Sequence, residues 1–305
     1  MRSLRYLLLG LGLVLTQCLQ AGAEGVPLTV YYRVLMIKTD RGLGTGFTLD
    51  VDGRQYLVTA RHMVKGLEPE TTVSVARYDA SGKVKYVDYR MKVLMCDDPV
   101  DIAVLIPPEQ LTLSTTLEPA GSGNSPLFGQ ELYFVGFPFG RLHMETTATP
   151  EIVLRSPFAY IRRAILSSMN TLQTRDKTTT EYMLDGYNMG GFSGSPVVYY
   201  PRDGASDMKV VAVICSYTTE YGPVLTPKKI RREQATPEEY GEGRIREKDG
   251  HTYRLEEPKK MKDKRYVILN TAITHAYDIR HAVDLIHQHP DGPRVDANFM
   301  PPLAR

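Results

Sequence analysis

The sequence predicts an all-β protein in two halves, with one helix near the C-terminus. Three observations predict this class. Short apolar and β-branched runs recur at close spacing, and turn-forming pairs such as Asp52-Gly53 and Ser81-Gly82 separate them. A stretch rich in Pro, Ser, Thr and Gly over 107–129 divides the runs into two sets. Strands joined in this way by hairpins build a barrel or a sandwich.

The two sets of strand-like runs define the two halves. The first set covers residues 29–39, 46–49, 56–60, 71–78, 84–96 and 102–106. The second set covers residues 131–137, 159–169, 180–184, 195–200, 209–217 and 265–270. We therefore expect a first domain over 24–115 and a second domain over 116–290.

The helix is predicted over 276–289. Ile279, Ala282, Val283 and Ile286 stand at i, i+3, i+4 and i+7, which is one apolar stripe, and Pro290 ends the pattern. Residues 291–305 are then a tail.

The N-terminus is typical of a secretory signal peptide. Arg2 and Arg5 precede the apolar run 7–15, and Ala21-Gly22-Ala23 gives the small-residue pattern of a cleavage site. The run is short for a transmembrane helix, and bulky Gln17 stands before Cys18, where a lipid-anchored protein usually has a small residue. We expect residues 1–23 to be removed and the protein to be secreted or periplasmic.

The remaining cysteines, Cys96 and Cys215, both lie in apolar strand-like runs. In an oxidising compartment they could form a disulfide, and two buried free thiols are an equal alternative. No cysteine or histidine cluster has metal-site spacing. We therefore expect no metal and no cofactor.

The charge of the chain is unevenly placed. The net charge of +2 argues against nucleic acid as a partner, but residues 228–265 hold 13 Lys or Arg and 9 Asp or Glu. Few large apolar residues occur over about 222–265, which indicates a solvated hairpin or a flexible insertion in the second domain. A binding arm for an anionic surface, such as a membrane or a cell-wall polymer, is the alternative.

Three residues could together carry acyl transfer. His62 directly follows the strand-like run 56–60, Asp101 precedes the run 102–106, and Ser193 follows a pair of glycines ahead of another run. A serine nucleophile needs a base to take its proton and a carboxylate to orient that base. The chain order of His, Asp and Ser is that of the two-barrel proteases.

These residues lie in motifs that resemble those of the trypsin-like (chymotrypsin-fold) serine peptidases, closest to the bacterial HtrA/Deg-like branch. The motifs are Gly44-Thr45-Gly46-Phe47, Val58-Thr59-Ala60-Arg61-His62, Asp101-Ile102-Ala103-Val104-Leu105, Val135-Gly136-Phe137-Pro138-Phe139-Gly140 and Gly191-Phe192-Ser193-Gly194-Ser195-Pro196. The resemblance covers about residues 30–290. It implies two six-stranded antiparallel β-barrels and a serine endopeptidase that acts on proteins or peptides.

The resemblance also assigns roles. Ser193 is the nucleophile, His62 the general base and acid, and Asp101 the orienting carboxylate, while the backbone N–H groups of Gly191 and Ser193 form the oxyanion hole. Ser216 helps to hold the aspartate. The substrate main chain adds as a strand along Ser216, Tyr217 and Thr218.

Several residues depart from the family pattern. Ser195 stands where glycine is usual, and Phe192 replaces the aspartate that digestive enzymes use for activation by a new N-terminus. Tyr187 occupies the place of the specificity acid of trypsin, so we expect a small or apolar substrate side chain before the scissile bond. We also expect no PDZ module after residue 292.

An alternative keeps the fold without constitutive catalysis. Fold does not fix function, and the double glycine Gly190-Gly191 could allow the oxyanion loop to rest in a collapsed state. The chain would then be a catalytically silent or effector-gated binding module, similar to a chaperone.

Overall fold

The fold is described from a computed structural model. It describes residues 25–121, 123, 125–140, 157–173, 178–201, 207–256 and 266–304. The predicted signal peptide, residues 1–23, lies outside the described residues. Within the described residues, no helix combines the length and the apolar character needed to cross a membrane.

The first domain is a closed antiparallel barrel with the strand order β1-β2-β3-β6-β5-β4. Its strands are β1 (Val34–Thr39), β2 (Gly42–Val51), β3 (Arg54–Thr59), β4 (Glu70–Tyr78), β5 (Val84–Met95) and β6 (Ala103–Ile106). The β2–β3 hairpin shows how its sequence sets the geometry: Asp52 and Gly53 both have positive φ, 50° and 70°. Two such residues make the tight turn that matches strand twist, as the Asp-Gly pair predicts.

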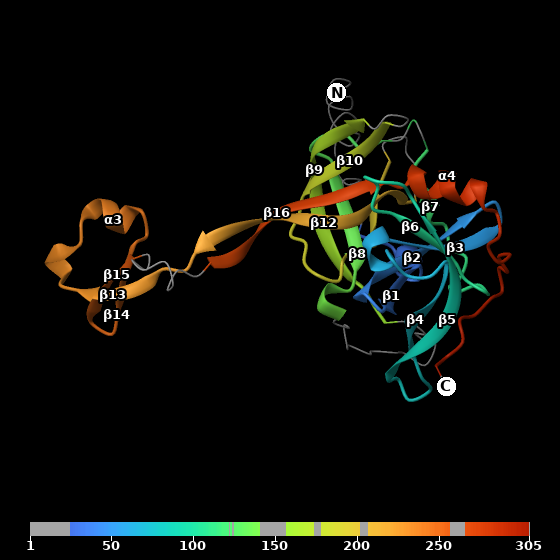
Figure 1. The fold of residues 1–305 in the computed structure, drawn as a ribbon, viewed down its shortest axis with the longest axis horizontal. Helices are drawn as coiled ribbons and strands as arrows, with labels where there is room; N and C mark the ends of the chain where they lie inside the picture. Colours follow the sequence, from blue (N-terminus) through green and yellow to red (C-terminus); the bar gives the residue numbers. More distant parts are fainter. Residues whose placement is uncertain are drawn as a thin grey trace, which may run out of the picture.

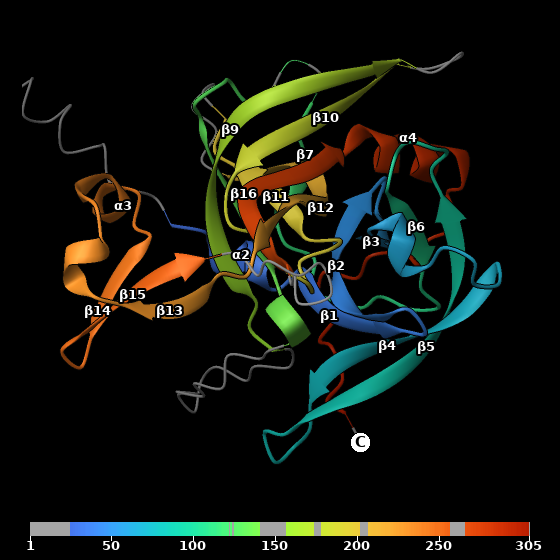
Figure 2. The same ribbon diagram turned by 60° about the vertical axis from the view of Figure 1, so that its left-hand side comes forward.

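The second domain is also a ring of six strands. Its strands are β8 (Glu131–Gly136), β9 (Tyr160–Gln173), β10 (Thr178–Asp185), β11 (Pro196–Tyr199), β12 (Lys209–Pro223) and β16 (Tyr266–Asp278). They run in the order β11-β8-β9-β10-β16-β12, and an additional β11–β12 pairing closes the ring. The short β7 (Glu118–Pro119) lies parallel to the start of β12. The predicted all-β class with two barrels is confirmed, and Figure 2 shows them side by side.

The C-terminal helix is present but shorter than predicted. The helix α4 covers Arg280–Gln288, so the prediction of a start at residue 276 is wrong. Ala276 pairs with Tyr182 of β10 and with Ile214 of β12, which makes it a central position of β16. Cross-strand pairing on both sides overrides the helical spacing of the apolar residues.

The first predicted strand is also corrected at its start. Residues Leu28–Tyr31 form the short helix α2, and β1 begins at Val34. Pro27 stands immediately before this helix as its N-cap residue, in an extended conformation with φ −71° and ψ 154°.

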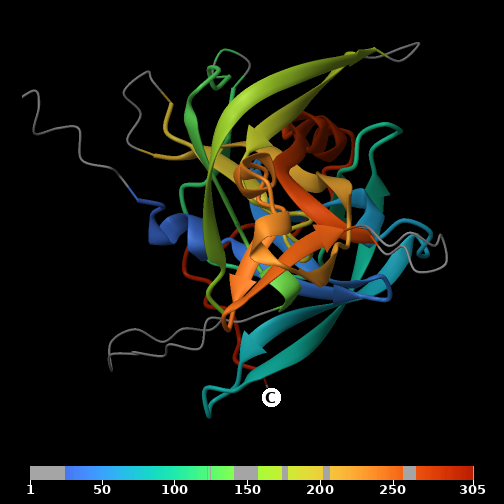
Figure 3. The ribbon, with the colours of Figure 1, turned by 90° about the vertical axis from the view of Figure 1, so that its left-hand side faces the viewer.

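The charged insertion carries a small sheet of its own. It contains β13 (Thr226–Ile230), the turn η3 (Arg232–Gln234), α3 (Pro237–Gly241), β14 (Ile245–Lys248) and β15 (His251–Glu256), with the strand order β13-β15-β14. The outer halves of β12 and β16 pair from Thr219↔Asn270 to Pro223↔Tyr266 and form a ribbon that leads away from the barrels. Figure 1 shows the insertion at the far end of this ribbon, and Figure 3 shows it from the front, with the barrels behind it.

The two barrels share one continuous core. One cluster of buried residues includes Val34 and Phe47 of the first barrel together with Val135 and Val213 of the second, and Ile286 of α4 packs into it. The tail returns to the first barrel, where Gln55 N donates to Pro293 O. The residues at the strand ends where the two barrels meet are therefore held in fixed relative positions.

Candidate active site

The pairing of β3 with β6 brings His62 and Asp101 together. Thr59, the last residue of β3, pairs with Ala103, the first residue of β6. Antiparallel pairing places the residue that leaves one strand next to the residue that enters the other. His62, in the 3-10 turn η1 (Arg61–Met63), therefore faces Asp101.

The carboxylate of Asp101 holds His62 at two points. His62 Nδ1 lies 2.6 Å from Asp101 Oδ2, and the His62 backbone N–H donates to Oδ1 at 2.8 Å. Because an ionised carboxylate only accepts, the proton in the side-chain bond belongs to Nδ1, which leaves Nε2 as a base. The His62 side chain is 45 % exposed, so Nε2 is open to a substrate.

Ser193 lies in the turn before β11, at the junction of the barrels. Its carbonyl accepts a hydrogen bond from Thr45 N at 3.0 Å, which ties the turn to β2. Gly194, the next residue, has φ +87°, and a Cβ there would lie 3.0 Å from Ala60 N and closer still to the Thr45 carbonyl. Gly194, next to Ser193, thus packs tightly against the backbone of Ala60, two positions before His62.

The structure forms one part of the predicted chain of hydrogen bonds, the part between His62 and Asp101. The His62–Asp101 bonds are present. No hydrogen bond between Ser193 Oγ and the His62 ring occurs within the described residues. Catalytic bonds of this kind often tighten only when a substrate is bound.

The glycine turn before Ser193 has a geometry that only glycine permits. Gly191 has φ +101°, and a Cβ on it would lie 2.7 Å from Phe139 N and nearer still to the Phe137 carbonyl. Phe139 N donates to the Gly190 carbonyl at 2.6 Å. In a trans peptide the C=O and the N–H point in opposite directions, so the Gly191 N–H points away from Phe139.

The N–H groups of Gly191 and Ser193 are free donors. Within the described part of the chain, neither donates to a protein acceptor, whereas the following Gly194 and Ser195 donate to Ile214 O and Phe192 O. Two unpaired backbone donors separated by one residue are what an oxyanion hole requires.

Thr45 supports this glycine turn. The sequence did not predict this role of Thr45. Its hydroxyl donates to the Gly191 carbonyl at 2.7 Å and accepts from Phe137 N at 3.0 Å. Phe192 anchors the same turn, since its ring is fully buried and packs edge-on against Phe134 at 5.0 Å. The motif Gly44-Thr45-Gly46-Phe47 was part of the family resemblance. Only the folded structure shows which backbone groups the Thr45 hydroxyl binds.

The comparison with protein families now decides the class. A family model described as a trypsin-like peptidase domain matches residues 44–205, which is more than half of the chain. The chain belongs to this family. The match contains all three of His62, Asp101 and Ser193.

Solved structures similar to this trypsin-like peptidase domain include bacterial proteases. Rv3671c from M. tuberculosis H37Rv, in an inactive mutant form, is 15 % identical, with 86 % of this chain and 88 % of that chain covered and a TM-score of 0.46. The HtrA-type protease AlgW with a tripeptide is 14 % identical, with coverage of 87 % and 62 % and a TM-score of 0.46. The MamO protease domain from Magnetospirillum magneticum is 13 % identical, with coverage of 84 % and 96 % and a TM-score of 0.42. A comparison with curated protein sequences found no significant match.

The predicted substrate edge of the trypsin-like domain has no neighbouring strand within the described residues. The pairing of β11 with β12 ends at Pro196↔Val213, while β16 continues to pair with the other side of β12. Within the described residues, no strand pairs with the outer edge of Ser216, Tyr217 and Thr218. An extended peptide could therefore add to this edge.

Individual residues near this edge have defined contacts. The Ser216 hydroxyl lies 3.8 Å from Cys215 Sγ, and the Ser216 carbonyl accepts from Asn188 Nδ2 at 3.2 Å. The role of Ser216 in holding Asp101 remains a prediction. Tyr187 is half-exposed, and the guanidinium of Arg162 lies 5.9 Å from the centre of its ring. At the position that corresponds to the specificity acid of trypsin, this chain therefore has the aromatic ring of Tyr187 next to the guanidinium cation of Arg162.

Cys96 and Cys215 do not form a disulfide with each other. Cys215 is buried beside the substrate edge, and its Sγ donates to the His275 carbonyl at 3.2 Å. Burial, reinforced by the charge of Asp101, raises the pKa of this thiol to about 12. Cys215 is therefore a neutral core residue rather than a second nucleophile.

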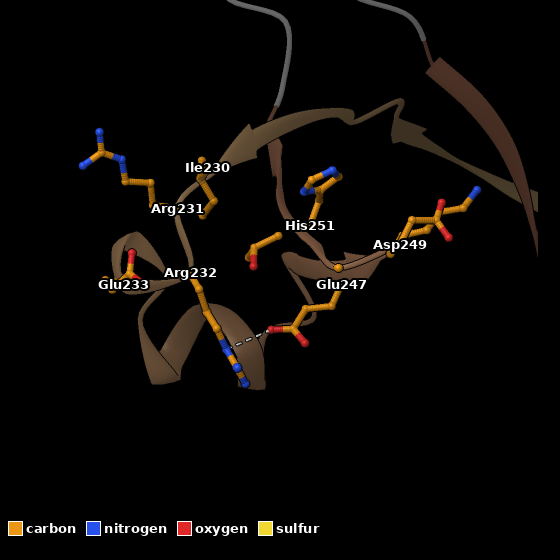
Figure 4. A pocket seen from close by; sticks show the side chains of 10 residues that line it. Ile230, Arg231, Arg232, Glu233, Glu247, Asp249 and His251 are labelled. Carbon is orange, nitrogen blue, oxygen red and sulfur yellow. Dashed lines mark ion pairs between the residues drawn. The ribbon is translucent and has the colours of Figure 1, made fainter.

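A hollow in the distal sheet is separate from this site. It has a volume of about 630 Å³ and is lined by residues 230–233 and 247–252. Figure 4 shows the ion pair between Arg232 and Glu247 across it, at 3.4 Å. None of His62, Asp101 and Ser193 lines it, so it has no part in the chemistry considered above.

Proposed function

We propose that this trypsin-like peptidase is a serine endopeptidase in which Ser193, His62 and Asp101 form a catalytic triad. The observation that carries the proposal is the double hold of Asp101 on His62, through Nδ1 and the backbone N–H. This contact fixes both the tautomer and the orientation that a general base needs. The position of Ser193 on the adjacent turn supports its role as the nucleophile.

In the proposed reaction, His62 Nε2 takes the proton of Ser193 Oγ as the oxygen attacks the carbonyl carbon of the scissile peptide. The N–H groups of Gly191 and Ser193 donate to the carbonyl oxygen as it becomes negative. His62 then gives its proton to the leaving amine, and an acyl-enzyme forms on Ser193. Water, deprotonated by His62, attacks this ester, and the proton returns to Ser193 as the acid product leaves.

The substrate is proposed to be an unfolded or extended polypeptide. The edge at Ser216, Tyr217 and Thr218, which has no neighbouring strand within the described residues, supports binding of the main chain as an added strand. Tyr187 replaces the acid that selects Arg or Lys, which supports a small or apolar side chain before the scissile bond.

The location of the enzyme is proposed from the sequence. Arg2, Arg5 and the apolar run 7–15 support export and cleavage near Ala23.

The role of the insertion as an arm for anionic surfaces remains a separate prediction. Residues 226–256 hold eight Lys or Arg and seven Asp or Glu, so most of the basic excess belongs to 257–265, outside the described residues.

Hydrolysis of an unfolded protein tests the proposal. The chain from residue 24 is expected to cleave reduced, unfolded casein, and Ser193→Ala is expected to abolish cleavage. Ser167→Ala removes a hydroxyl on β9 whose bond to the Ile165 carbonyl is long, at 3.4 Å, and is the matched control with full activity. Cleavage by the Ser193→Ala variant at the wild-type rate would refute the assignment.

The gated or silent alternative predicts a different result in the same assay. It requires a collapsed oxyanion loop at rest, whereas the bond from Phe139 N to the Gly190 carbonyl supports a turn already in its working shape. A wild-type protein that cleaves nothing without an added effector would favour the alternative.

A further inference from the structure

A second carboxylate–histidine–hydroxyl chain lies behind the predicted substrate edge. His275 Nδ1 lies 3.0 Å from Glu181 Oε1, and His275 Nε2 lies 2.8 Å from Thr218 Oγ1. Glu181 lies on β10, His275 on β16 and Thr218 on β12, and these strands are neighbours in the sheet in this order. The His275 and Glu181 side chains are only 19 % and 16 % exposed, so the protein rather than solvent determines their hydrogen bonds.

This chain is held in place at both ends of the histidine. The second oxygen of Glu181 accepts from Asn170 Nδ2 at 3.2 Å. The carbonyl of His275 accepts from Cys215 Sγ at 3.2 Å. The bonds of the two ring nitrogens to Glu181 and Thr218 orient the imidazole so that Nε2 faces Thr218.

The fixed orientation makes the hydrogen-bonding role of Thr218 depend on the protonation of His275. In the neutral ring, Nδ1–H donates to Glu181, so Nε2 must accept the Thr218 proton. The Thr218 oxygen can then only accept from a substrate. In the protonated ring, Nε2–H donates to Thr218 Oγ1, which frees the hydroxyl proton to donate outward.

We propose that the Glu181–His275 pair sets whether Thr218 donates to or accepts from the substrate, and so makes the preference for an acidic over an amide side chain depend on pH. This inference rests on the proposed function, because it takes Thr218 to lie on the substrate edge. Thr218 is the specificity-determining contact, and His275 and Glu181 are positioning residues. A carboxylate can only accept, so it suits Thr218 as a donor, whereas an amide can also donate to Thr218 as an acceptor.

The charged and titratable groups around His275 come from three neighbouring strands. Glu181 from β10 bonds to the ring, and the thiol of Cys215 from β12 bonds to the backbone carbonyl of His275. Tyr277 stands two residues further along β16, and its phenol is affected by Glu181, Cys215, Asp101 and Arg61. Burial raises the pKa of the Cys215 thiol and of the Tyr277 phenol to about 12. Both stay neutral between pH 5.5 and 8.5, the range in which an imidazole changes charge.

Paired peptides that differ only by Glu or Gln at one position measure this preference. The pair is placed in turn at each of the four positions before the scissile bond, and kcat/KM is measured from pH 5.5 to 8.5. Any pH dependence that the two peptides share cancels in the Glu/Gln ratio. At the position that contacts Thr218, we expect the ratio to rise about 5- to 10-fold as the pH falls, in line with the net strength of a typical hydrogen bond.

Variants separate a specific role from a structural one. Thr218→Val keeps the shape and His275→Asn keeps a polar side chain that does not titrate, so both are expected to make the ratio independent of pH. Glu181→Gln removes the anion that favours the imidazolium and is expected to move the change in ratio to lower pH. The matched control is His281→Asn, which breaks the His281–Thr179 hydrogen bond away from the substrate edge and is expected to keep the wild-type ratio profile.

The outcomes distinguish the inference from the proposed function. If wild-type protein cleaves neither peptide and does not react with a fluorophosphonate serine probe, the proposed function fails. If it cleaves both and the ratio stays flat at all four positions, or if Thr218→Val keeps the wild-type pH dependence, the inference is overturned. Should His275→Asn not fold, Thr218→Val still tests the inference, because the ratio does not depend on the fraction of active enzyme.

Discussion

The sharpest prediction compares two adjacent glycines in the oxyanion turn. At Gly191, φ is +101°, and an added Cβ would lie 2.7 Å from Phe139 N and nearer to the Phe137 carbonyl. At Gly190, the nearest atoms to an added Cβ belong to the Phe139 ring, at 3.7 and 3.8 Å, which is ordinary van der Waals contact. Gly191→Ala is therefore a disruptive substitution, and Gly190→Ala is its matched control.

The magnitude follows from two effects. An alanine at this φ is strained by about 1–3 kcal/mol, so the turn relieves the strain by moving. The movement turns the Gly191 N–H away from its position, and loss of one oxyanion donor lowers kcat by about 10²- to 10³-fold. We expect kcat to fall by at least about 100-fold in Gly191→Ala and to stay within about 3-fold of wild type in Gly190→Ala.

The assay is steady-state hydrolysis of a peptide substrate, with near-ultraviolet circular dichroism and thermal unfolding measured on each variant. These controls show whether lost activity reflects a moved turn or an unfolded protein. A Gly191→Ala variant that keeps a third or more of wild-type kcat would contradict the geometry described for the turn. Equal losses in the two variants would contradict it as well.

Three further predictions follow from the site. Asp101→Asn is expected to lower kcat by about 10³- to 10⁴-fold, because the amide no longer enforces the His62 tautomer; a loss below 10-fold would argue against the triad. Thr45→Val leaves two backbone groups unpaired and is expected to reduce the free energy of unfolding by about 1–3 kcal/mol, which urea denaturation measures; an unchanged value would show that the hydroxyl does not support the turn. Cys215 is expected to resist alkylation at pH 8, while Cys96 reacts first. Because the folded pKa of Cys215 lies at about 12 and the ordinary value is 9.0, stability is expected to decline as pH rises from 9 towards 12, and Cys215→Ala removes that part of the decline.

The sequence predicted most of the fold because its hairpins carry their own signals. Apolar runs and turn pairs such as Asp52-Gly53 located most strands to within a few residues. The predictions 209–217 and 265–270 ended too early, because β12 extends to Pro223 and β16 to Asp278. The start of α4 was wrong because Ala276 fits a helical stripe as well as a central strand. Only the pairing of β16 with β10 and β12 decides between them.

The small sheet of the insertion was not predicted either. Its few apolar residues gave no clear periodicity over 226–256, although local signals were present. The bond from Glu239 N to Thr236 Oγ1 caps α3, and Asp249-Gly250 forms a turn with positive φ at both residues. Local signals of this kind fix turns and caps but not the pairing of β13 with β15.

The site was predictable where the chemistry lies within short motifs. His62 and Asp101 stand at the ends of paired strands, and the glycines before Ser193 mark a strained turn. The chain Glu181–His275–Thr218 could not be found in this way, because its members lie 57 and 94 positions apart. Their meeting depends on the strand order β10-β16-β12, which the sequence pattern alone does not determine.

The central claim is that Ser193 is a nucleophile activated by His62. The most direct measurement is mass spectrometry of the protein after reaction with a fluorophosphonate probe, followed by peptide mapping. We expect one adduct per chain, on the peptide that contains Ser193, and none in His62→Ala under the same conditions. An adduct on another residue, or equal labelling of wild type and His62→Ala, would contradict the claim.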